Sequence, residues 1–237
     1  MRGFEFDISG SWGHFKRSET NNNPLTHDII PKTALIGLIG AVMGIERASM
    51  RSIFPQLSDD LIYGVKLNNP IRKYSIGFTG HSAIMPTAVK SPKAFEFLRD
   101  PSYRVCLGLY NSRSESLYDE FEKSVIEGYS VYEPVLGIAN CPAELSFLNC
   151  GEISEEKHDD FSTAGFVISN QHKLKKLEDG FRIGFDKIPT FQNDDFWNLP
   201  DREVEVIYPE CSHILKVDGP YREYSHHEGE IEKWVLI

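Results

Sequence analysis

The sequence has few cysteines, no long apolar run and no excess of positive charge, and each shortage excludes a class of protein. Its four cysteines, Cys106, Cys141, Cys150 and Cys211, form no C-x-x-C pair, so we predict neither a zinc site nor a disulfide-stapled fold. The longest apolar run, Ala34 to Ile45, is interrupted by glycines and is shorter than the roughly 20 residues of a membrane span. We therefore expect no membrane association and no cofactor.

The first residues also lack the uninterrupted apolar stretch of a signal peptide, because Glu5 and Asp7 lie among them. We therefore expect a cytoplasmic protein. With 237 residues, of which 41% are hydrophobic and 12% aromatic, the chain is long and apolar enough to bury a substantial core.

The formal net charge of −10 argues against nucleic-acid binding when taken alone, because phosphate binding depends on Lys and Arg. The charge is unevenly distributed, however. Residues 1–110 hold 13 Lys and Arg against 9 Asp and Glu, whereas the remainder holds 12 against 26. This asymmetry is compatible with one face that tolerates a polyanion and another that meets a basic protein, or with solvated acidic loops in the second half.

Period-two runs and helical patterns give an expected order of elements. Alternating apolar residues predict strands at residues 3–8, 61–67, 103–109 and 143–148. An apolar segment from Pro31 to Arg47 predicts a buried helix. The spacing of Leu117, Phe121 and Val125 predicts a second, amphipathic helix. The resulting order predicts an α+β fold of the ferredoxin-like βαββαβ type, which RNA-recognition (RRM-like) modules share.

Three further segments complete the expected organisation. Residues 9–30 are polar and rich in Gly, Asn and Pro, which predicts a long exposed loop. Residues 68–102 form a basic insert between two strands, for which we expect a protruding hairpin. The acidic stretch 151–160 predicts a boundary between residues 1–150 and a small antiparallel β-rich region at 151–237.

Glycines interrupt the predicted apolar helix at regular intervals. Gly37, Gly40 and Gly44 are spaced three and four residues apart and share one helical face. Because each glycine weakens a helix by roughly 1 kcal/mol, we expect a packing reason for them. That reason would be a close approach of the helix to the sheet.

The segment that follows the first strand joins aromatic rings to cations. Trp12, His14 and Phe15 are rings that can stack on bases, and Lys16 and Arg17 can hold phosphates. This combination is typical of single-stranded nucleic-acid recognition. A purely structural alternative stays open, in which Trp12 and Phe15 fill the edge of the core.

Several runs of residues occur in the order expected of one known family. They are FDISGSWGHFKRSETNNN, IPKTALIGLIGAVMGIER, GVKLNNPIRKY, SPKAFEFLRDPSYRVCL and YEPVLGIANCPAEL, all within residues 1–150. Together they resemble CRISPR-associated protein family five of the RAMP superfamily. The opening run is most similar to the type I-B branch.

The resemblance implies an RNA-recognition core with a protruding thumb and a small C-terminal β region. It also implies a place in the type I Cascade complex, which serves antiviral defence. There, members of the family cap the 5′ handle of the guide RNA (crRNA) and contact the backbone subunit and the large subunit. Target DNA would be met indirectly, through the complex.

The resemblance also assigns residues to roles. Those expected to line the handle pocket are Trp12, His14, Phe15, Lys16 and Arg17. The cations that flank the glycine-containing helix and would reach phosphates are Lys32, Arg47 and Arg51. The residues expected in the thumb are Arg72, Lys73 and Tyr74. The glycines expected to be structural are Gly37, Gly40, Gly44 and Gly137.

Two other functions stay open. The type I-C branch of the family cuts precursor RNA without metal, which requires a base, an acid and a cation near the phosphate. Suitable residue types are His14, His81, Tyr74 and Lys73, but no adjacent Lys-His pair maps onto that branch's site, so we expect no enzymatic activity. The other possibility is a ferredoxin-like protein-interaction module without an RNA role.

A polar group near the C-terminus could imitate a metal site. It consists of His226, His227, Glu228 and Glu230. Because adjacent side chains on a strand point to opposite faces, we interpret the group as a solvated tail and expect no bound metal.

Overall fold

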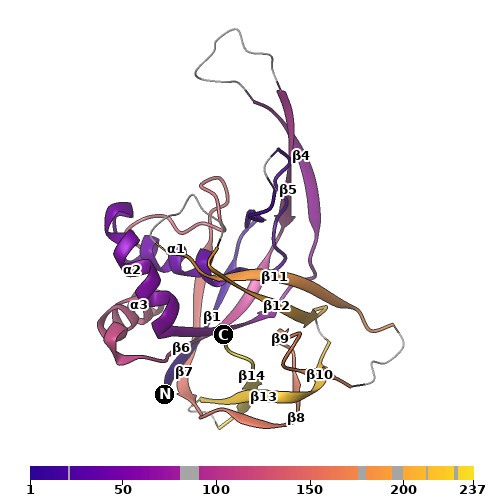
Figure 1. Cartoon of the computed structure of the whole chain (residues 1–237). Helices are drawn as coiled ribbons and strands as arrows, with labels where there is room; N and C mark the ends of the chain where they lie inside the picture. Colours follow the sequence, from indigo (N-terminus) through magenta and orange to yellow (C-terminus); the bar gives the residue numbers. More distant parts are fainter. Residues whose placement is uncertain (21, 81–90, 176–179, 194–199, 212, 227–228) are drawn as a thin grey trace.

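A mixed α/β architecture dominated by antiparallel sheet is seen in the computed structural model (Figure 1). The structure describes residues 1–20, 22–80, 91–175, 180–193, 200–211, 213–226 and 229–237. Its central strands are β1 (Arg2–Ser9), β3 (Leu61–Leu67), β6 (Ser102–Leu109) and β7 (Glu144–Ile153). They lie side by side in the order β7-β1-β6-β3, with antiparallel pairing throughout. The four predicted strands are therefore confirmed.

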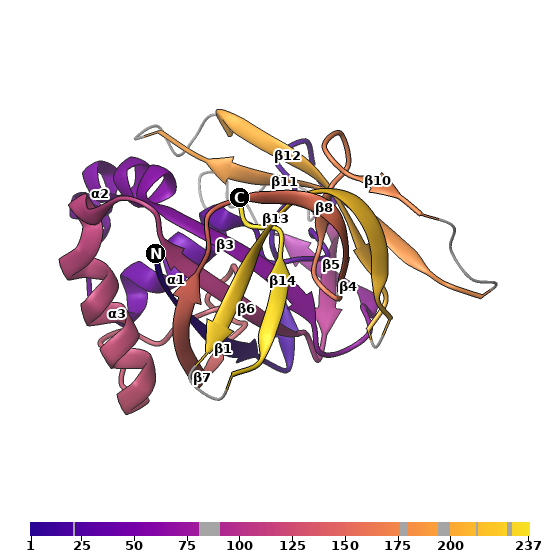
Figure 2. The ribbon, with the colours of Figure 1, turned by 90° about the horizontal axis from the view of Figure 1, so that it is seen from below.

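The helices cover one face of this sheet (Figure 2). They are α1 (Lys32–Val42), α2 (Arg47–Asp60) and α3 (Glu115–Glu127), with a short 3-10 helix at Ser112–Ser114. Phe4 and Phe6 of β1 alternate toward them, and the Phe6 ring lies 5.6 Å from the Phe121 ring of α3. This alternation buries the apolar side of β1 against the apolar stripe of α3, as the sequence predicts.

The predicted helix over residues 31–47 is shorter than expected, because only α1 (Lys32–Val42) lies within it. α1 ends at Val42, and Gly44 has a φ of +71°, which turns the chain away from the helical path. A Cβ at Gly44 would lie 2.5 Å from a methyl carbon of Val131. A new helix, α2, then begins at Arg47 and was not predicted.

The role expected for the helix glycines is also different. Gly40 faces α2 rather than the sheet, since a Cβ there would lie 2.7 Å from the Met50 sulfur. Gly37 is exposed, and a Cβ at this position would meet nothing within 4 Å. The expectation that these glycines bring the helix close to the sheet is therefore wrong.

The segment 9–30 is a long connection, but the expectation that it is exposed is wrong for much of it. The short strand β2 (Trp12–Gly13) pairs with the hairpin strand β5 (Ser91–Arg99). His14, Phe15 and Ile30 are buried. Polar residues of the segment are buried as well, because each has a hydrogen-bond partner. The Thr26 hydroxyl accepts the Phe15 N–H at 2.9 Å, and His27 bonds to Asp186 outside the segment.

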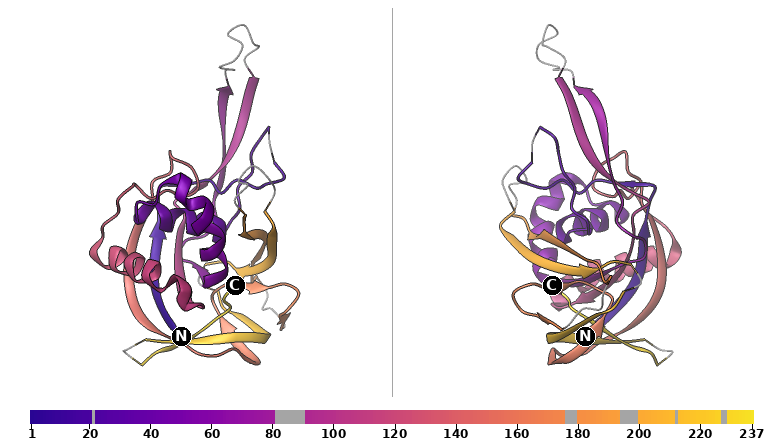
Figure 3. Two further views of the ribbon diagram at one scale, coloured as in Figure 1. Left: turned by 60° about the vertical axis from the view of Figure 1, so that its left-hand side comes forward. Right: turned by 90° about the vertical axis from the view of Figure 1, so that its right-hand side faces the viewer.

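The basic insert forms an antiparallel hairpin of β4 (Lys73–Gly80) and β5, which stands away from the body of the molecule (Figures 1 and 3). Tyr74 lies opposite Phe97, and Ile76 lies opposite Phe95. Residues 81–90, which include His81, lie outside the described part of the chain.

The C-terminal part consists of strands. These are β8 (Lys157–Thr163), β9 (Val167–Ile168), β10 (Lys173–Leu174), β11 (Ile183–Phe191), β12 (Arg202–Pro209), β13 (Leu215–His226) and β14 (Ile231–Trp234). Strands β11, β12 and β9 form a sheet of their own, whereas β13 pairs with β7 and extends the central sheet. The predicted boundary at residue 151 falls inside β7, and the division of the chain there stays a prediction.

A second cluster of buried residues lies where β13 and β14 meet the central sheet. It contains Cys106, Ile153, Tyr224 and Trp234. Tyr224 and Trp234 are fully buried, so the strands that carry them close this part of the sheet from solvent. Among the described residues, no helix is long and apolar enough to cross a membrane.

Candidate functional site

A cavity of about 270 Å³ lies beside the start of α1 and brings several of the predicted site residues together. Its lining includes His14, Phe15, Lys16, Pro31, Thr33, Ala34, Phe54, Gly137 and Ile138. Three of the five residues predicted from the segment after β1 therefore line one cavity, together with Gly137 from a distant part of the chain.

Gly137 is required by the close approach of two backbone segments. Its φ is +92°, and a Cβ there would lie 2.0 Å from the carbonyl oxygen of His14. The His14 N–H in turn donates to the Leu136 carbonyl at 2.9 Å. Any side chain at position 137 would push these segments apart and deform the cavity wall.

The two rings nearest the cavity are more buried than expected. His14 is 2% exposed and Phe15 is 2% exposed. The Nδ1 atom of His14 lies 2.7 Å from the Glu96 carbonyl oxygen, and burial lowers the pKa of the imidazole. Phe15 belongs to the hydrophobic core. The structural alternative for Phe15 is thus correct, and both rings form the cavity wall.

Positive charge at the cavity comes from Lys16 and from the start of α1. Lys16 is exposed. Pro31 caps α1 without a side-chain hydrogen bond to the first turn, so the positive end of the helix dipole faces the cavity that Thr33 and Ala34 line. An exposed cation and the end of a helix are together suited to hold an anion.

Lys32 is placed differently from the prediction that it reaches phosphates. Its side chain is buried, with 6% of the residue exposed. Burial lowers the pKa of its ammonium group to about 8, with a smaller contribution from the nearby charge of Arg202. In this position Lys32 is a residue of the protein interior.

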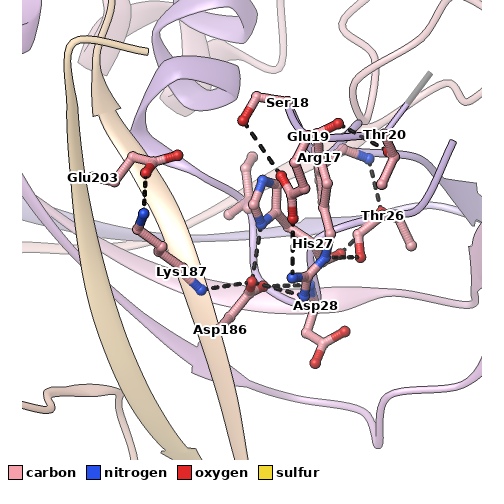
Figure 4. Close-up of polar contacts among 12 residues, drawn as sticks. Arg17, Ser18, Glu19, Thr20, Thr26, His27, Asp28, Asp186, Lys187 and Glu203 are labelled. Carbon is pink, nitrogen blue, oxygen red and sulfur yellow. Dashed lines mark hydrogen bonds and ion pairs between the residues drawn. The ribbon is translucent and has the colours of Figure 1, made fainter. Parts of the chain in front are cut away.

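Arg17 is held by an acidic residue from the C-terminal part of the chain (Figure 4). Its guanidinium donates to Asp186 of β11 at 2.9 Å. The Nδ1 atom of His27 also lies 2.9 Å from the Asp186 carboxylate, which accepts the Asp28 N–H at 2.7 Å. Burial raises the pKa of Asp186, but these hydrogen bonds and the Arg17 charge outweigh it and lower that pKa below its usual value. Arg17 therefore fastens segment 9–30 to β11.

Next to the cavity, one face of the β2-β5-β4 sheet carries a row of rings. Trp12 contacts Tyr74 and Phe97 edge-on, with centroids 6.2 and 6.1 Å apart. Phe78 packs against Phe95 at 5.4 Å. Tyr74 is 44% exposed and Phe78 is 46% exposed. These two rings present flat apolar surface to solvent, which is the geometry that stacks on bases.

Several residues of this ring face were missed by the sequence interpretation. Phe78, Phe95 and Phe97 belong to it, as does Arg99, whose guanidinium lies 5.5 Å from the Tyr74 ring centroid. Their alternation along residues 74–78 and 95–99 is a period-two signal that was available. The basic composition of the insert drew attention to its charges instead.

The opposite face of the hairpin serves to anchor it. The Lys73 ammonium pairs with Asp28 at 2.5 Å and with Glu96 at 3.2 Å, and it donates to the Thr26 carbonyl. Arg72 is exposed beside it. Of the predicted thumb residues, Tyr74 therefore lies on the ring face, whereas Lys73 holds the base of the hairpin.

Arg47 and Arg51 are exposed on the first turns of α2. Within the part of the chain that the structure describes, no hydrogen bond or ion pair joins them to the cavity or to the ring face. His226 lies 3.8 Å from Glu230; the other members of the predicted polar group, His227 and Glu228, lie outside the described residues.

Comparison with known proteins places these features in a family. Residues 3–149 match the sequence model of a family described as CRISPR-associated protein (Cas_Cas5). No curated protein matches the chain.

Solved structures resemble the chain over nearly its whole length. A CRISPR protein from Archaeoglobus fulgidus is 15% identical, with 99% of each chain covered and a TM-score of 0.61. A chain of a CRISPR RNA-guided surveillance complex is 11% identical, with 92% and 91% covered and a TM-score of 0.56. A chain of the type III-B Cmr-beta complex bound to cognate target RNA and AMPPnP is 11% identical, with 90% and 86% covered and a TM-score of 0.50. At such identities the likeness shows a shared fold.

Proposed function

Because the chain belongs to the Cas5 family of CRISPR-associated proteins, we propose that it is a non-catalytic subunit of a type I Cascade complex that binds the 5′ handle of the guide RNA. The observation that carries this proposal is the cavity beside α1, with the ring face of the hairpin next to it. A phosphate would lie at the start of α1 near Lys16, and adjacent bases would stack on Tyr74 and Phe78.

The strand order supports a ferredoxin-like assignment for residues 1–150. In the sequence β7-β1-β6-β3 the fourth, first, third and second strands of the predicted unit lie side by side, which is the order that a βαββαβ unit adopts. In RNA-recognition modules of this type, the sheet itself binds bases. Here β13 and β14 close part of the sheet, so the proposed RNA site lies at its edge and on the hairpin.

The proposal that the chain is not a nuclease rests on the state of the candidate groups. His14 is buried with Nδ1 against a backbone carbonyl, and the ammonium of Lys73 is neutralised by two carboxylates. Neither is presented to a scissile phosphate in the way that acid-base cleavage requires. The nuclease of the type I-C kind is therefore the second candidate.

The proposed partners are the backbone subunit and the large subunit of a type I-B complex, with target DNA met through the complex. Exposed acidic residues of the turn between β7 and β8, Glu155 and Glu156, lie at the end of the molecule opposite the hairpin (Figure 1). Such a surface repels RNA and favours a basic protein partner.

Lys16→Ala tests the proposal directly. We expect weaker binding of a handle RNA and a salt dependence of the binding constant reduced by about 0.7 in slope, because one phosphate contact is lost from a single strand. Fluorescence anisotropy across a series of salt concentrations measures both. Lys123→Ala is the matched control, because Lys123 is an exposed lysine of α3 that does not line the cavity. This variant should change neither the affinity nor the slope.

An unchanged slope for Lys16→Ala would contradict the site. The purified wild-type protein is expected to leave repeat RNA intact in EDTA, as judged on a denaturing gel. Efficient cutting there would favour the nuclease.

A further inference from the structure

A second hollow, of about 660 Å³, lies between α1 and α2. α1 contributes Gly37 and Gly40, α2 contributes Met50 and Phe54, and Tyr132 stands at its rim. Most of the lining is apolar. We call this hollow the α1–α2 groove.

Gly37 is the glycine of the groove for which no packing contact within the described chain requires the absence of a side chain. Gly40 fits tightly against the Met50 sulfur, so a larger residue would clash there. Gly37 lies in the middle of an 11-residue helix, is exposed, and has nothing within 4 Å of a Cβ position. Glycine at such a place weakens the helix relative to alanine. Its effect is to leave the backbone of α1 open to close approach from outside.

Tyr132, which lines the groove, and its neighbour Val131 are held in place by backbone hydrogen bonds. The N–H groups of Val131 and Tyr132 donate to the carbonyls of Val42 and Ala41, at 2.9 and 3.0 Å, at the end of α1. Val131 is 50% exposed and Tyr132 is 49% exposed. Apolar surface that is both exposed and fixed is typical of a binding surface.

The charges beside the groove are mainly positive. Arg47 and Arg51 lie one turn apart on α2 and are exposed, and among the described residues neither guanidinium has a hydrogen-bond or ion-pair partner. The first turn of α2 has no side-chain cap hydrogen bond from Glu46, so the positive end of the helix dipole lies there as well. Glu46 is the one acidic residue of the lining.

We infer that the α1–α2 groove binds an amphipathic helix of a partner protein, with its apolar face over Gly37, Met50 and Phe54 and its acidic side chains paired with Arg47 and Arg51. Recognition of this kind places apolar residues at i, i+3, i+4 and i+7 in a hydrophobic groove. RNA is a poorer occupant, because it would have to cover the floor of Gly37, Met50 and Phe54, whose side chains offer a nucleic acid neither charge nor hydrogen bonds. Arg47 and Arg51, which would pair with the partner, lie outside the lining of the proposed RNA cavity, although Phe54 lines both hollows.

The test uses the full chain and two fluorescein-labelled helical peptides of 18 residues (about five turns) with leucines at i, i+3, i+4 and i+7. One peptide carries Glu on its flanks and the other carries Lys. We expect the Glu peptide to bind at least tenfold more tightly than the Lys peptide in anisotropy titrations. Gly37→Leu should abolish binding by filling the groove, and Arg47→Glu with Arg51→Glu should reverse the preference for the Glu peptide.

Gly37→Ala separates binding from folding. The melting temperature of this variant, followed by circular dichroism, should rise because alanine favours the helix, while its affinity for the Glu peptide should fall. Ala48→Leu, at an exposed position of α2 that does not line the groove, should leave binding unchanged. Equal binding of both peptides, no binding of either, or binding that survives Gly37→Leu would overturn the inference. The inference would also be overturned if Gly37→Leu disrupted a dimer of the chain or an RNA complex, because the groove would then bind a second copy or RNA.

Discussion

At the scale of single residues, Lys32 shows how burial changes the role of a cation. The family resemblance implied that Lys32 would reach a phosphate, but its side chain is buried. A charged ammonium group in the interior is destabilising unless it is paired. Burial lowers the pKa of Lys32 to about 8, and the charge of Arg202 lowers it further, while Asp59 raises it only in part. Asp59 is itself engaged by Arg202 at 2.5 Å.

Lys32→Met is expected to stabilise the protein. Because the pKa of Lys32 is lower in the folded state than in the unfolded chain, the unfavourable term is fully present below about pH 8 and disappears as the pH rises toward about 10.4. The variant should gain on the order of 3 kcal/mol in the free energy of unfolding at pH 7. Urea denaturation at several pH values measures this gain, which should shrink above pH 8. A variant less stable than the wild type at pH 7 would show that Lys32 has a stabilising partner.

Asp186 is the residue through which the N-terminal segment and the C-terminal strands are joined. Asp186→Asn should lower the free energy of unfolding at pH 7 by about 2 kcal/mol, because Arg17 and His27 lose a charged acceptor. The pKa of Asp186 is lowered in the folded state, so its contribution is present at neutral pH and is lost as the pH falls below about 4.

Urea denaturation at pH 7 and at pH 3 tests this explanation. The variant should be less stable than the wild type at pH 7 and differ less from it at pH 3, whereas a simple loss of packing would destabilise it equally at both pH values. Asp160→Asn is the control, because it removes an exposed ion pair with Lys175 that solvent screens.

At the scale of elements, the period-two strands and the amphipathic α3 could be predicted, since each buries one face against the core. The division between α1 and α2 could not, because Gly44 was interpreted as part of a helical face rather than as a left-handed turn. The apolar spacing of Met50, Phe54 and Leu57 was available as a signal for α2, but Pro55 interrupts the pattern.

The candidate site shows the same limit. The residues of segment 12–17 were predicted as a group, but their burial depends on contacts with distant partners. His14 meets Glu96, and Arg17 meets Asp186. No local pattern reports such contacts, and this is why exposed Lys16 and anchored Arg17 look alike in the sequence.

The hairpin carries the exposed rings on which we expect RNA bases to stack. Tyr74→Ala and Phe78→Ala should each weaken handle RNA binding by about 1 to 3 kcal/mol, the value of one stacked base. Because both rings are nearly half exposed, melting temperatures should change little. Tyr110→Ala, at a ring that is 62% exposed at the end of β6, is the matched control. If both hairpin variants bind the handle RNA with full affinity, bases do not stack on Tyr74 and Phe78.

At the scale of the whole molecule, exposed basic residues and the acidic turn lie at different ends. Exposed Lys16 lies at the cavity, and exposed Arg72, Lys93 and Arg99 lie on or beside the hairpin strands. The acidic turn between β7 and β8 lies at the opposite end of the molecule (Figure 1). A net charge of −10 is therefore compatible with RNA binding, because the field that a polyanion meets is set by the nearest groups within about 10 Å.

Cross-linking tests the central claim most directly. A handle RNA with 4-thiouridine at each position in turn would be bound to the full chain and irradiated, and the cross-linked peptides would be identified by mass spectrometry. The account predicts adducts within residues 12–17 and 72–78, on the cavity wall and the ring face. Adducts confined to residues 151–237 would contradict it.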